Sequence, residues 1–408
     1  MTTAPPGWLV LAATLAVQSL VAMALLTLPV VAPTVAQALN ISAAYVGLYV
    51  SIVYAGAMTA SLLAGGAVRR FGAIRLSQLG LVLCGAGLVL CTVESPVAMA
   101  LVAGLIGLGY GPITPASSHL LALTTPAHRM SLVFSIKQTG VPVGGMLAGA
   151  IVPGAAAAIG WKFAFLAVAA GCLLCALAVQ PLCRSLDADK NRQQRISFGN
   201  GLAGPLKLVF GQRSLAVLAA VSFFFSITQL SLTTYMVTFL HQDLGMTLIL
   251  AGMALAVSQA AGVAGRLVWG YVSDRFLGAS RMLAALALLI ALSAIATALL
   301  QPSTSPATVL VILSLFGASA VGWNGVYLAE VARQAPPGKA SIATGGTLAM
   351  TFLGVVVGPP FFGAIAGASG SYGLAYASLV VPAALCLWLM ISQRHAFVAP
   401  PVLRESVD

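Results

Sequence analysis

The chain has 408 residues, of which 60% are hydrophobic and only 7% are charged, and its formal net charge is +11. A soluble domain carries about 25% charged residues, so the composition excludes a soluble globular enzyme. A surplus of basic residues is also found in nucleic-acid-binding proteins, but here they lie in short loops between long apolar stretches. That distribution is typical of an integral membrane protein and predicts the lipid bilayer, not nucleic acid, as the partner.

Long apolar runs predict twelve transmembrane helices. The predicted spans are 8–36, 43–68, 73–92, 97–124, 130–156, 160–182, 213–238, 246–272, 281–300, 306–334, 340–367 and 372–393. The first run is too long for the apolar core of a signal peptide, so we interpret it as an uncleaved first helix. The longest polar stretch, 183–212, predicts a cytoplasmic linker between an N-terminal half, 1–182, and a C-terminal half, 213–408. The predicted fold class is an all-α integral membrane protein.

The basic residues divide unequally between the two sides of the predicted membrane. If the N-terminus is cytoplasmic, the cytoplasmic ends and loops hold all but three of them: Arg69, Arg70, Arg75, Arg129, Arg184, Lys190, Arg192, Arg195, Lys207, Arg213, Arg275, Arg281, Arg333, Lys339, Arg394 and Arg404. The opposite side holds only Lys162, and Lys137 and Arg266 fall inside apolar spans. This asymmetry follows the positive-inside rule and places both termini in the cytoplasm.

The six cysteines do not indicate a cofactor. Cys172 and Cys175 form a Cys-x-x-Cys pattern, but it lies within the apolar run GCLLCALAV, where a metal or redox site would lack polar support. Packing is the expected role of these side chains. The sequence therefore predicts neither a metal site nor a cofactor.

The two halves carry related motifs, roughly half the chain apart. The stretch Gly65–Gly72 after the second span resembles Gly270–Phe276 after the eighth, and PAHRMS (126–131) resembles PPGKAS (336–341). Gly140–Gly145 in the fifth span resembles Gly358–Gly363 in the eleventh, and Gln18 corresponds to Gln229. Four matches in the same order indicate two parallel six-helix repeats, an arrangement found in major facilitator transporters.

The loop after the second span is similar to the motif G-x-x-x-D-R-x-G-R/K-R/K of the major facilitator superfamily. Gly65, Arg70 and Gly72 match it, whereas Arg69 replaces the acid; in the second copy Gly270, Asp274 and Arg275 match. The resemblance covers essentially the whole chain and implies two pseudo-symmetric six-helix halves that work by alternating access. It also implies that these seven residues form a cytoplasmic gate, in which glycine allows close helix approach and Asp274 is the charged latch.

The fifth and eleventh spans carry the residues predicted to act as hinges. They are Gly140, Pro142, Gly144, Gly145, Gly358, Pro359 and Pro360. Glycine and proline permit close packing and bending of membrane helices. The Gly-x-Pro-x-x-Gly-Gly stretch also resembles a motif of proton-coupled efflux proteins, but the fourth span lacks the arginine that usually accompanies it, in the stretch Ala103–Gly107.

Arg266 is the first candidate substrate ligand. A charge inside the membrane costs roughly 2.5–3.5 kcal/mol, so it is expected to face a cavity and a partner. Of the eight acidic residues only Glu330 falls inside a predicted span, which favours an anionic ligand as that partner. The position resembles the substrate-binding arginine of monocarboxylate and oxalate/formate transporters, although Gly262 stands where the former have an aspartate. The alternative is an arginine that reaches the cytoplasmic interface.

Lys137 is the second candidate. It lies about 10 Å into the fifth span and Arg266 about 9 Å into the eighth, and the resemblance places these helices side by side. Two cations that face one cavity would repel each other unless an anion bridged them. The alternatives are that Lys137 binds backbone carbonyl groups or Glu330.

Neutral polar residues inside the spans could complete the site. These candidates are Gln18, Gln229, Gln138, Gln259, Asn324 and Tyr327, each of which could instead form a helix–helix hydrogen bond. His119 and Glu330, near the cytoplasmic ends of the fourth and tenth spans, are candidates for a proton relay or for gate residues.

The sequence thus predicts a secondary active transporter, not an enzyme, that moves a small organic anion such as a carboxylate across a bacterial inner membrane. No Walker A motif is present, and protons are a possible coupling ion. The chain is expected to act as a monomer. A proton-coupled exporter of drugs or metabolites is the alternative, but it predicts an interior carboxylate. A receptor or membrane enzyme is a third class, for which the sequence offers no catalytic cluster.

Overall fold

The computed structural model describes residues 5–126, 129–188, 190–191, 193, 203–336, 339–393 and 397. Within them, twelve helical segments are long and apolar enough to cross a membrane. They are Gly7–Ala38, Ala43–Phe71, Ala73–Cys91, Pro96–Thr124, Val133–Ile159, Trp161–Leu186, Arg213–Gln242, Leu248–Leu277, Ala279–Ala298, Pro306–Gln334, Ile342–Ser369 and Tyr372–Ser392. The predicted fold class is confirmed, and the predicted spans agree with these to within a few residues.

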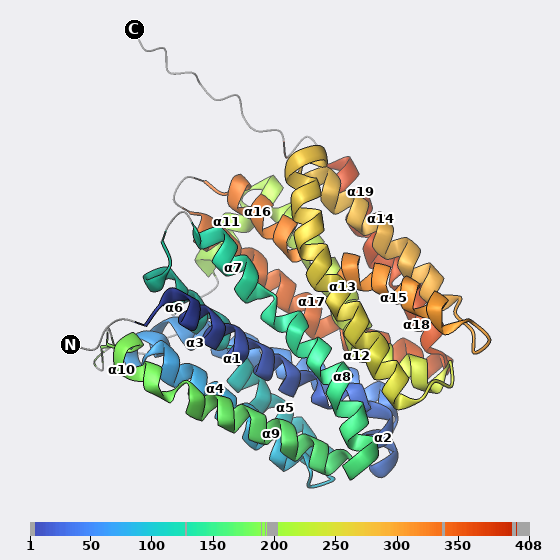
Figure 1. Ribbon diagram of the computed structural model, residues 1–408. Coiled ribbons are helices and arrows are strands. Elements are labelled where there is room, and N and C mark those ends of the chain that lie inside the picture. Colours follow the sequence, from blue (N-terminus) through green and yellow to red (C-terminus); the bar gives the residue numbers. More distant parts are fainter. Residues whose placement is uncertain are drawn as a thin grey trace.

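The N-terminal half contains the first six spans (Figure 1). Its elements are α1 (Gly7–Thr27), η1 (Pro29–Val31), α2 (Ala32–Ala38), η2 (Ala43–Tyr45), α3 (Val46–Phe71), α4 (Ala73–Cys91), α5 (Pro96–Tyr110), α6 (Ile113–Thr124), α7 (Met130–Gln138), α8 (Gly140–Ile159), α9 (Trp161–Ala178), η4 (Gln180–Leu182) and α10 (Cys183–Leu186). A short helix, α11 (Ala203–Phe210), lies in the predicted linker and packs against α17 of the other half.

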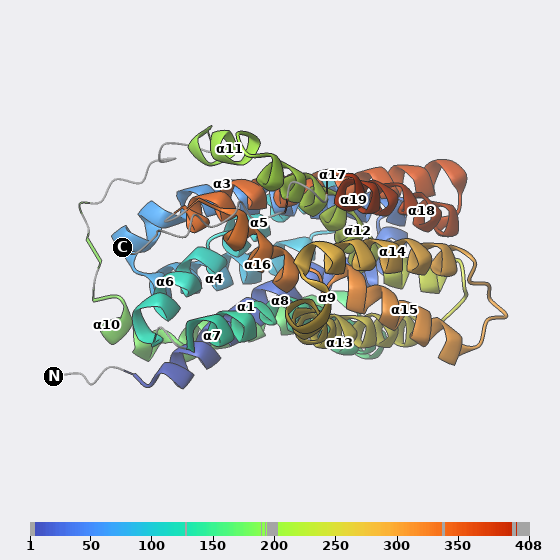
Figure 2. The ribbon, with the colours of Figure 1, turned by 90° about the horizontal axis from the view of Figure 1, so that it is seen from above.

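The C-terminal half contains the remaining six spans. Its elements are α12 (Arg213–Gln242), α13 (Leu248–Val272), η5 (Ser273–Leu277), α14 (Ala279–Ala298), α15 (Pro306–Ala320), α16 (Asn324–Gln334), α17 (Ala340–Ser369), α18 (Tyr372–Ser378) and α19 (Val380–Ser392). Figure 2 shows the two halves meeting along two edges, with α3 beside α17 and α8 beside α13.

The fourth and tenth spans share a break at corresponding positions. The fourth is interrupted between α5 and α6, where Pro112 has no N–H to donate, and the tenth between α15 and α16 at Gly322. One turn before each break, a Cβ on Gly107 would collide with the backbone oxygen of Val53, and one on Gly317 with that of Ser258. In both halves this glycine therefore lets the broken span press against the second span of its own half.

Both halves place most of their basic residues at one end of the molecule. We call the end that carries Arg69, Arg75, Arg275 and Arg281 the basic face, and the end that carries Lys162 the opposite face. Helix α1 begins and α19 ends at the basic face (Figure 1). The predicted basic residues Arg192, Arg195, Arg394 and Arg404, and Pro337 and Gly338 of the second loop repeat, lie outside the described residues.

The halves are closed against each other at the opposite face. The Tyr235 hydroxyl lies 2.6 Å from the carbonyl oxygen of Ala44 and 3.0 Å from that of Pro359. A Cβ on Gly47 would collide with both Tyr235 and Pro359, so glycine is what permits this approach. One turn further into the membrane, the Ser51 hydroxyl donates to the carbonyl of Val356 at 2.6 Å.

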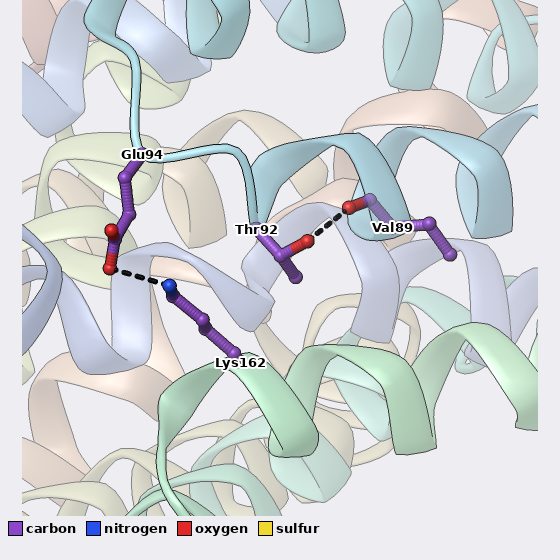
Figure 3. A network of polar contacts seen from close by, with 4 residues as sticks. All are labelled: Val89, Thr92, Glu94 and Lys162. Carbon is purple, nitrogen blue, oxygen red and sulfur yellow. Dashed lines mark hydrogen bonds and ion pairs between the residues drawn. The ribbon is translucent and has the colours of Figure 1, made fainter.

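Polar residues at the opposite face hold the connecting loops. Figure 3 shows the ion pair between Lys162 Nζ and Glu94 Oε1, 2.8 Å apart, beside the Thr92 hydroxyl that donates to the carbonyl of Val89. In the other half, Asp243 accepts hydrogen bonds from the backbone N–H groups of Tyr372 and Gly373, although burial raises the pKa of its carboxyl group. The one cation that the sequence places on this side is therefore paired.

Candidate functional site

A narrow cavity lies between the two halves, halfway along the spans. Its volume is about 30 Å³, which is room for a water molecule and far below the size of a ligand pocket, so the halves must move apart there before a substrate can enter. Its lining comes from both halves: Ala22, Leu25, Leu26, Tyr54, Tyr110, Val141, Gln229, Leu230, Thr233, Gln259 and Val321. A cavity shared by the two halves is where a moving pair of domains would hold a substrate.

Aromatic rings and amide groups supply most of the chemistry of this cavity. The rings of Tyr54 and Tyr110 meet edge to face, with centroids 5.8 Å apart. Gln259 Nε2 donates to the hydroxyl of Thr233 at 3.2 Å. Gln229 Oε1 accepts from Trp323 Nε1 at 2.9 Å, which leaves its amide N–H groups for a ligand. The cavity therefore offers flat apolar surfaces and a small number of donors.

Arg266 reaches between the halves to two backbone carbonyl groups. Its Nη1 donates to the carbonyl of Gln138 at 2.8 Å, and its Nε donates to that of Val321 at 3.2 Å. The helical partner of the Gln138 carbonyl would be residue 142, but Pro142 has no N–H, so this carbonyl is free to accept from Arg266. Arg266 therefore does not extend to the basic face. The expectation that it lacks a partner within the protein is not met, because two backbone carbonyl groups accept its hydrogen bonds.

The surroundings of Arg266 connect it to the cavity. Val321, whose carbonyl it binds, lines the cavity, and so does Tyr110, which lies close enough to interact with its charge. No carboxylate pairs with Arg266 among the described residues. Two hydrogen bonds use two of the five guanidinium N–H donors, so the group can still bind a ligand from the cavity side.

Lys137 is buried on α7, with only 1% of its surface exposed. Among the described residues, neither a carboxylate nor a hydrogen-bond acceptor contacts its Nζ atom. The two alternatives weighed for Lys137, binding to backbone carbonyls or to Glu330, are therefore not seen. Lys137 does not itself line the cavity, but Val141, four residues later, does.

Gln18 adds a second buried donor to the same region. Its Oε1 accepts from the hydroxyl of Thr114 at 3.1 Å, whereas its Nε2 is buried with no partner among the described residues. A Cβ on Gly140, three residues after Lys137, would lie 2.9 Å from the Gln18 side chain. Two orphan donors, Nε2 of Gln18 and Nζ of Lys137, thus belong to packed helices of one half.

The remaining substrate candidates have structural contacts. Gln138 contributes its backbone carbonyl to Arg266, Asn324 Nδ2 donates to Gln229 Oε1 at 3.3 Å, and Tyr327 packs its buried ring against Trp323. None of the three lines the cavity. Their predicted contact with substrate stays a prediction, and of the six neutral candidates only Gln229 and Gln259 line the cavity.

The two candidates for a proton relay lie apart from the cavity lining. Glu330 Oε2 pairs with Nε of Arg333 at 3.1 Å, and its Oε1 accepts from Gln334 at 2.8 Å. His119 is half-buried on α6, which packs against α7. Glu330 is therefore neutralised within its own helix, at the basic face.

The predicted gate residues lie at the basic face. A Cβ on Gly65 or on Gly270 would have nothing within 4 Å. The expectation that these glycines lie at close helix contacts is thus not met in this arrangement. Arg69, Arg70, Asp274 and Arg275 are exposed, whereas Gly72 is buried and has a φ angle of +96°, which favours glycine.

The predicted hinges differ between the two halves. The fifth span breaks at Thr139, directly before Gly140, and Pro142 follows within one turn. Gly144 packs against Ser19 of α1, and Gly145 against Gln259 of α13. In contrast, α17 is continuous through Gly358, Pro359 and Pro360. Movement at either position stays a prediction.

Sequence reasoning missed four residues that shape the cavity region: Tyr54, Tyr110, Thr233 and Trp323. One signal was available, because Tyr110 in Gly-Tyr-Gly-Pro and Trp323 in Gly-Trp-Asn-Gly occupy corresponding breaks of the fourth and tenth spans. An aromatic residue beside a glycine at a break inside a span is the signal that these two residues share. Tyr54 and Thr233 carry no such signal.

A larger groove lies elsewhere, near the opposite face of the N-terminal half. Its volume is about 290 Å³, it lies between α2, α3 and α5, and its lining is mostly apolar. A carboxylate would find no cationic group there. The central cavity is therefore the better candidate for an anion site.

Comparisons with known proteins agree with this arrangement of helices around a central cavity. The sequence model of the Major Facilitator Superfamily matches residues 14–350, and the chain belongs to this family of membrane transporters. A relative in Acinetobacter baylyi, a benzoate transport protein, is 23% identical over 352 residues, which cover 77% of this chain and 74% of that protein.

Solved structures show the same fold at low sequence identity. A bacterial homologue of the human lysosomal transporter Spinster, in an inward-facing and unoccupied conformation, has a TM-score of 0.76 at 17% identity and covers 97% of this chain and 99% of its own. A nucleoside transporter gives 0.74 at 16% identity, covering 95% and 100%, and a D-xylose–proton symporter gives 0.72 at 17% identity, covering 93% and 96%. These likenesses establish the major facilitator fold.

Proposed function

We propose that this transporter moves a small organic anion, a carboxylate, by alternating access. The observation that carries the proposal is the pair of buried donors, Lys137 Nζ and Gln18 Nε2, which have no acceptor among the described residues. Buried polar groups are normally hydrogen-bonded, and the exceptions call for an explanation such as an absent ion. A carboxylate supplies acceptor oxygens for these donors and a negatively charged partner for Lys137.

Arg266 has a second role in this proposal. Its two carbonyl bonds hold the guanidinium between α7 and the break of the tenth span, beside Tyr110. From there it attracts an anion into the cavity and can bind a carboxylate through its remaining donors. Because it also bridges the two halves, binding of an anion would change a contact between them.

Aromatic carboxylates are the first substrates to test. The edge-to-face rings of Tyr54 and Tyr110 offer apolar surface against which a flat ring can pack once the halves move apart. The distant relative that transports benzoate has a substrate of this kind. Benzoate combines one ring with one carboxylate, which matches one aromatic wall and one set of donors.

The orientation of the molecule in the membrane follows from the distribution of its basic residues. The positive-inside rule assigns the basic face to the cytoplasm, with both termini on that side of a bacterial inner membrane. With this orientation, the contacts of Tyr235 and Ser51 at the opposite face close the protein to the outside. The monomer is a sufficient unit, because one chain forms the cavity.

Uptake into proteoliposomes tests this function. Purified protein would be reconstituted and supplied with labelled benzoate, a set of aliphatic mono- and dicarboxylates, and xylose and a nucleoside as neutral comparators. We expect saturable uptake of a carboxylate that unlabelled carboxylates inhibit and the neutral compounds do not. Transport of a neutral compound or of a lipophilic cation, without any carboxylate, would refute the proposal and favour the efflux alternative.

A further inference from the structure

Lys137 occupies a setting in which a permanent positive charge is hard to explain. Its Nζ is buried, and within the described residues no acceptor contacts it. Helix α7 packs against α1, α6 and α8. Neither α1 nor α8 contains a titratable residue, and α6 contains only His119. Arg266, which binds the neighbouring carbonyl of Gln138, adds a positive charge to this region.

An isolated ammonium group is costly to bury, and such groups lose their proton rather than remain charged. A carboxylate placed against Nζ reverses this effect, because it supplies an opposite charge and accepts the hydrogen bond. The charge of Lys137 is thereby linked to the presence of an anion.

The usual groups that could bind a transported proton are poorly placed for it. Glu330, a buried carboxylate within a described span, is engaged by Arg333 and Gln334 at the basic face. Asp274 is exposed at the same face. The described interior thus offers Lys137 as its buried basic group without a hydrogen-bond partner.

We propose that Lys137 is the proton-binding residue that couples anion transport to the proton gradient. With the site empty, the side chain is a neutral amine. One proton and one carboxylate then bind together, so that R–COO⁻, H⁺ and Lys–NH₂ become an Lys–NH₃⁺ carboxylate pair. Release of the anion on the other side returns the proton to water and leaves the neutral amine for the return step. This inference rests on the proposed function and makes the transport electroneutral for a monocarboxylate.

The first test measures protons that bind together with the anion. Benzoate would be added to weakly buffered, detergent-purified protein that contains a pH-indicator dye, with aliphatic carboxylates as the second choice if benzoate does not bind. We expect wild type to take up about one proton per bound anion, and binding to strengthen as pH falls. Lys137→Arg should bind the anion with no proton uptake, because a guanidinium group stays protonated.

A wild-type protein that binds an anion without taking up protons would overturn the assignment. Proton uptake on anion binding that persists in Lys137→Arg would overturn the assignment as well. The variant His119→Gln tests whether the neighbouring histidine binds the proton instead. Uptake that remains near one proton per bound anion supports Lys137, and uptake that falls to zero assigns the proton to His119. Circular dichroism and the thermal midpoint would confirm that each variant is folded.

The second test compares exchange with net transport in proteoliposomes. A 1:1 proton–anion symporter at equilibrium accumulates the anion by about tenfold for each unit of pH difference. In Lys137→Arg we expect this accumulation to be lost, while exchange of internal for external anion remains measurable, since exchange needs no deprotonated return step. Accumulation driven by pH in Lys137→Arg would contradict the proposal. If wild type transports no carboxylate at all, it is the proposed function that fails.

Discussion

The loops after the second and the eighth span contain the same kind of turn. They differ in whether a carboxylate binds the backbone N–H groups of the loop. Each loop ends at a glycine with positive φ, Gly72 at +96° and Gly278 at +76°, before the next helix begins. In the first loop the carboxylate of Asp187, from the end of the sixth span, accepts from the N–H groups of Ile74 and Arg75 at 2.8 and 3.0 Å. In the second loop Asp274 is exposed.

From this difference we infer how the two repeats divide their roles. The first loop has lost the family acid to Arg69 but obtains a carboxylate from its own half, so its structure does not depend on the position of the other half. Asp274 of the second loop is available to the other half when the basic face closes. We infer that the N-terminal loop is a fixed part and that the C-terminal loop carries the latch.

The two buried cations show a parallel contrast. Arg266 in the C-terminal half has two carbonyl partners and bridges the halves, whereas Lys137 in the N-terminal half has none among the described residues. Arg266 stabilises the arrangement through its carbonyl contacts, whereas the unpaired amine of Lys137 destabilises it until an anion binds. Substitutions of the two should therefore have opposite effects on the empty protein.

Arg266→Lys is the change expected to have the largest effect. Lysine keeps the charge but cannot donate to the Gln138 and Val321 carbonyls with the geometry of a guanidinium group. Loss of hydrogen bonds to a charged group costs about 1.5–3 kcal/mol, and we therefore expect initial uptake to fall roughly 10- to 100-fold. The rate of labelled-carboxylate uptake measures this.

A matched control is Arg333→Lys, because the Arg333 side chain is 51% exposed at the basic face. Exposed ion pairs contribute little, so this variant should transport nearly as wild type does. Near-wild-type uptake by Arg266→Lys would show that its carbonyl bonds are incidental and that charge alone matters.

The motif glycines test whether the two halves close alike. Gly65 and Gly270 have open space around them now, so leucine at either position should fit without loss of stability. In the closed state the helices must approach there, and the added side chain should hold them apart and lower turnover about tenfold. Uptake rate and thermal midpoint would be compared for Gly65→Leu and Gly270→Leu. Gly154→Leu, also in open space but away from the basic face, is the control. Normal turnover in both motif variants would mean that neither glycine enters a tight contact.

The sequence was sufficient to predict the fold because the membrane limits the choices. A spanning segment must be apolar and must satisfy its own backbone, so length and hydropathy locate each helix. The break at Thr139 was foreseen only as a hinge motif around Gly140 and Pro142, and the paired breaks near Pro112 and Gly322 were not foreseen. Such breaks depend on which carbonyls a neighbouring helix can satisfy, which is not a property of one segment.

The site was predicted less completely, for the same reason. Arg266 and Lys137 were found because charges inside an apolar span are conspicuous. That Arg266 would find a carbonyl partner in Gln138 required knowing that α13 crosses the fifth span at the position freed by Pro142. Asp187 was overlooked because a carboxylate after the sixth span gives no sign that it contacts a loop more than a hundred residues earlier.

The contrast between the two cations predicts a gain of stability from Lys137→Met. Methionine has a similar length and no donor to satisfy, so it removes the unpaired buried amine. We expect the thermal midpoint of the empty protein to rise by roughly 2–5 °C, and the stabilisation that a bound carboxylate gives wild type to disappear. A scanning-fluorescence measurement with and without benzoate tests both effects. A fall in the midpoint without ligand would mean that Lys137 has a stabilising partner beyond the described residues.

The smallest expected effects come from the matched substitutions Asp187→Asn and Asp274→Asn, and they separate the fixed loop from the latch most directly. Asparagine in place of Asp187 keeps one acceptor but turns the other into a donor that faces a backbone N–H, so stability should fall by about 0.5–2 kcal/mol with no change of conformational balance. Asparagine in place of Asp274 removes a charge that is exposed now, so stability should stay the same. In the closed state, however, it weakens the latch, and a shift of about 1.4 kcal/mol changes the ratio of the two states tenfold. Turnover should slow by a few fold without a change in which substrates bind.

Maleimide labelling of a cysteine introduced by Val141→Cys in the cavity reports the ratio of the two conformational states, since the native cysteines are buried or half-buried. Labelling should rise in Asp274→Asn and not in Asp187→Asn; equal labelling in both would mean that Asp274 is only a solvated loop acid and that the two loops do not differ in role.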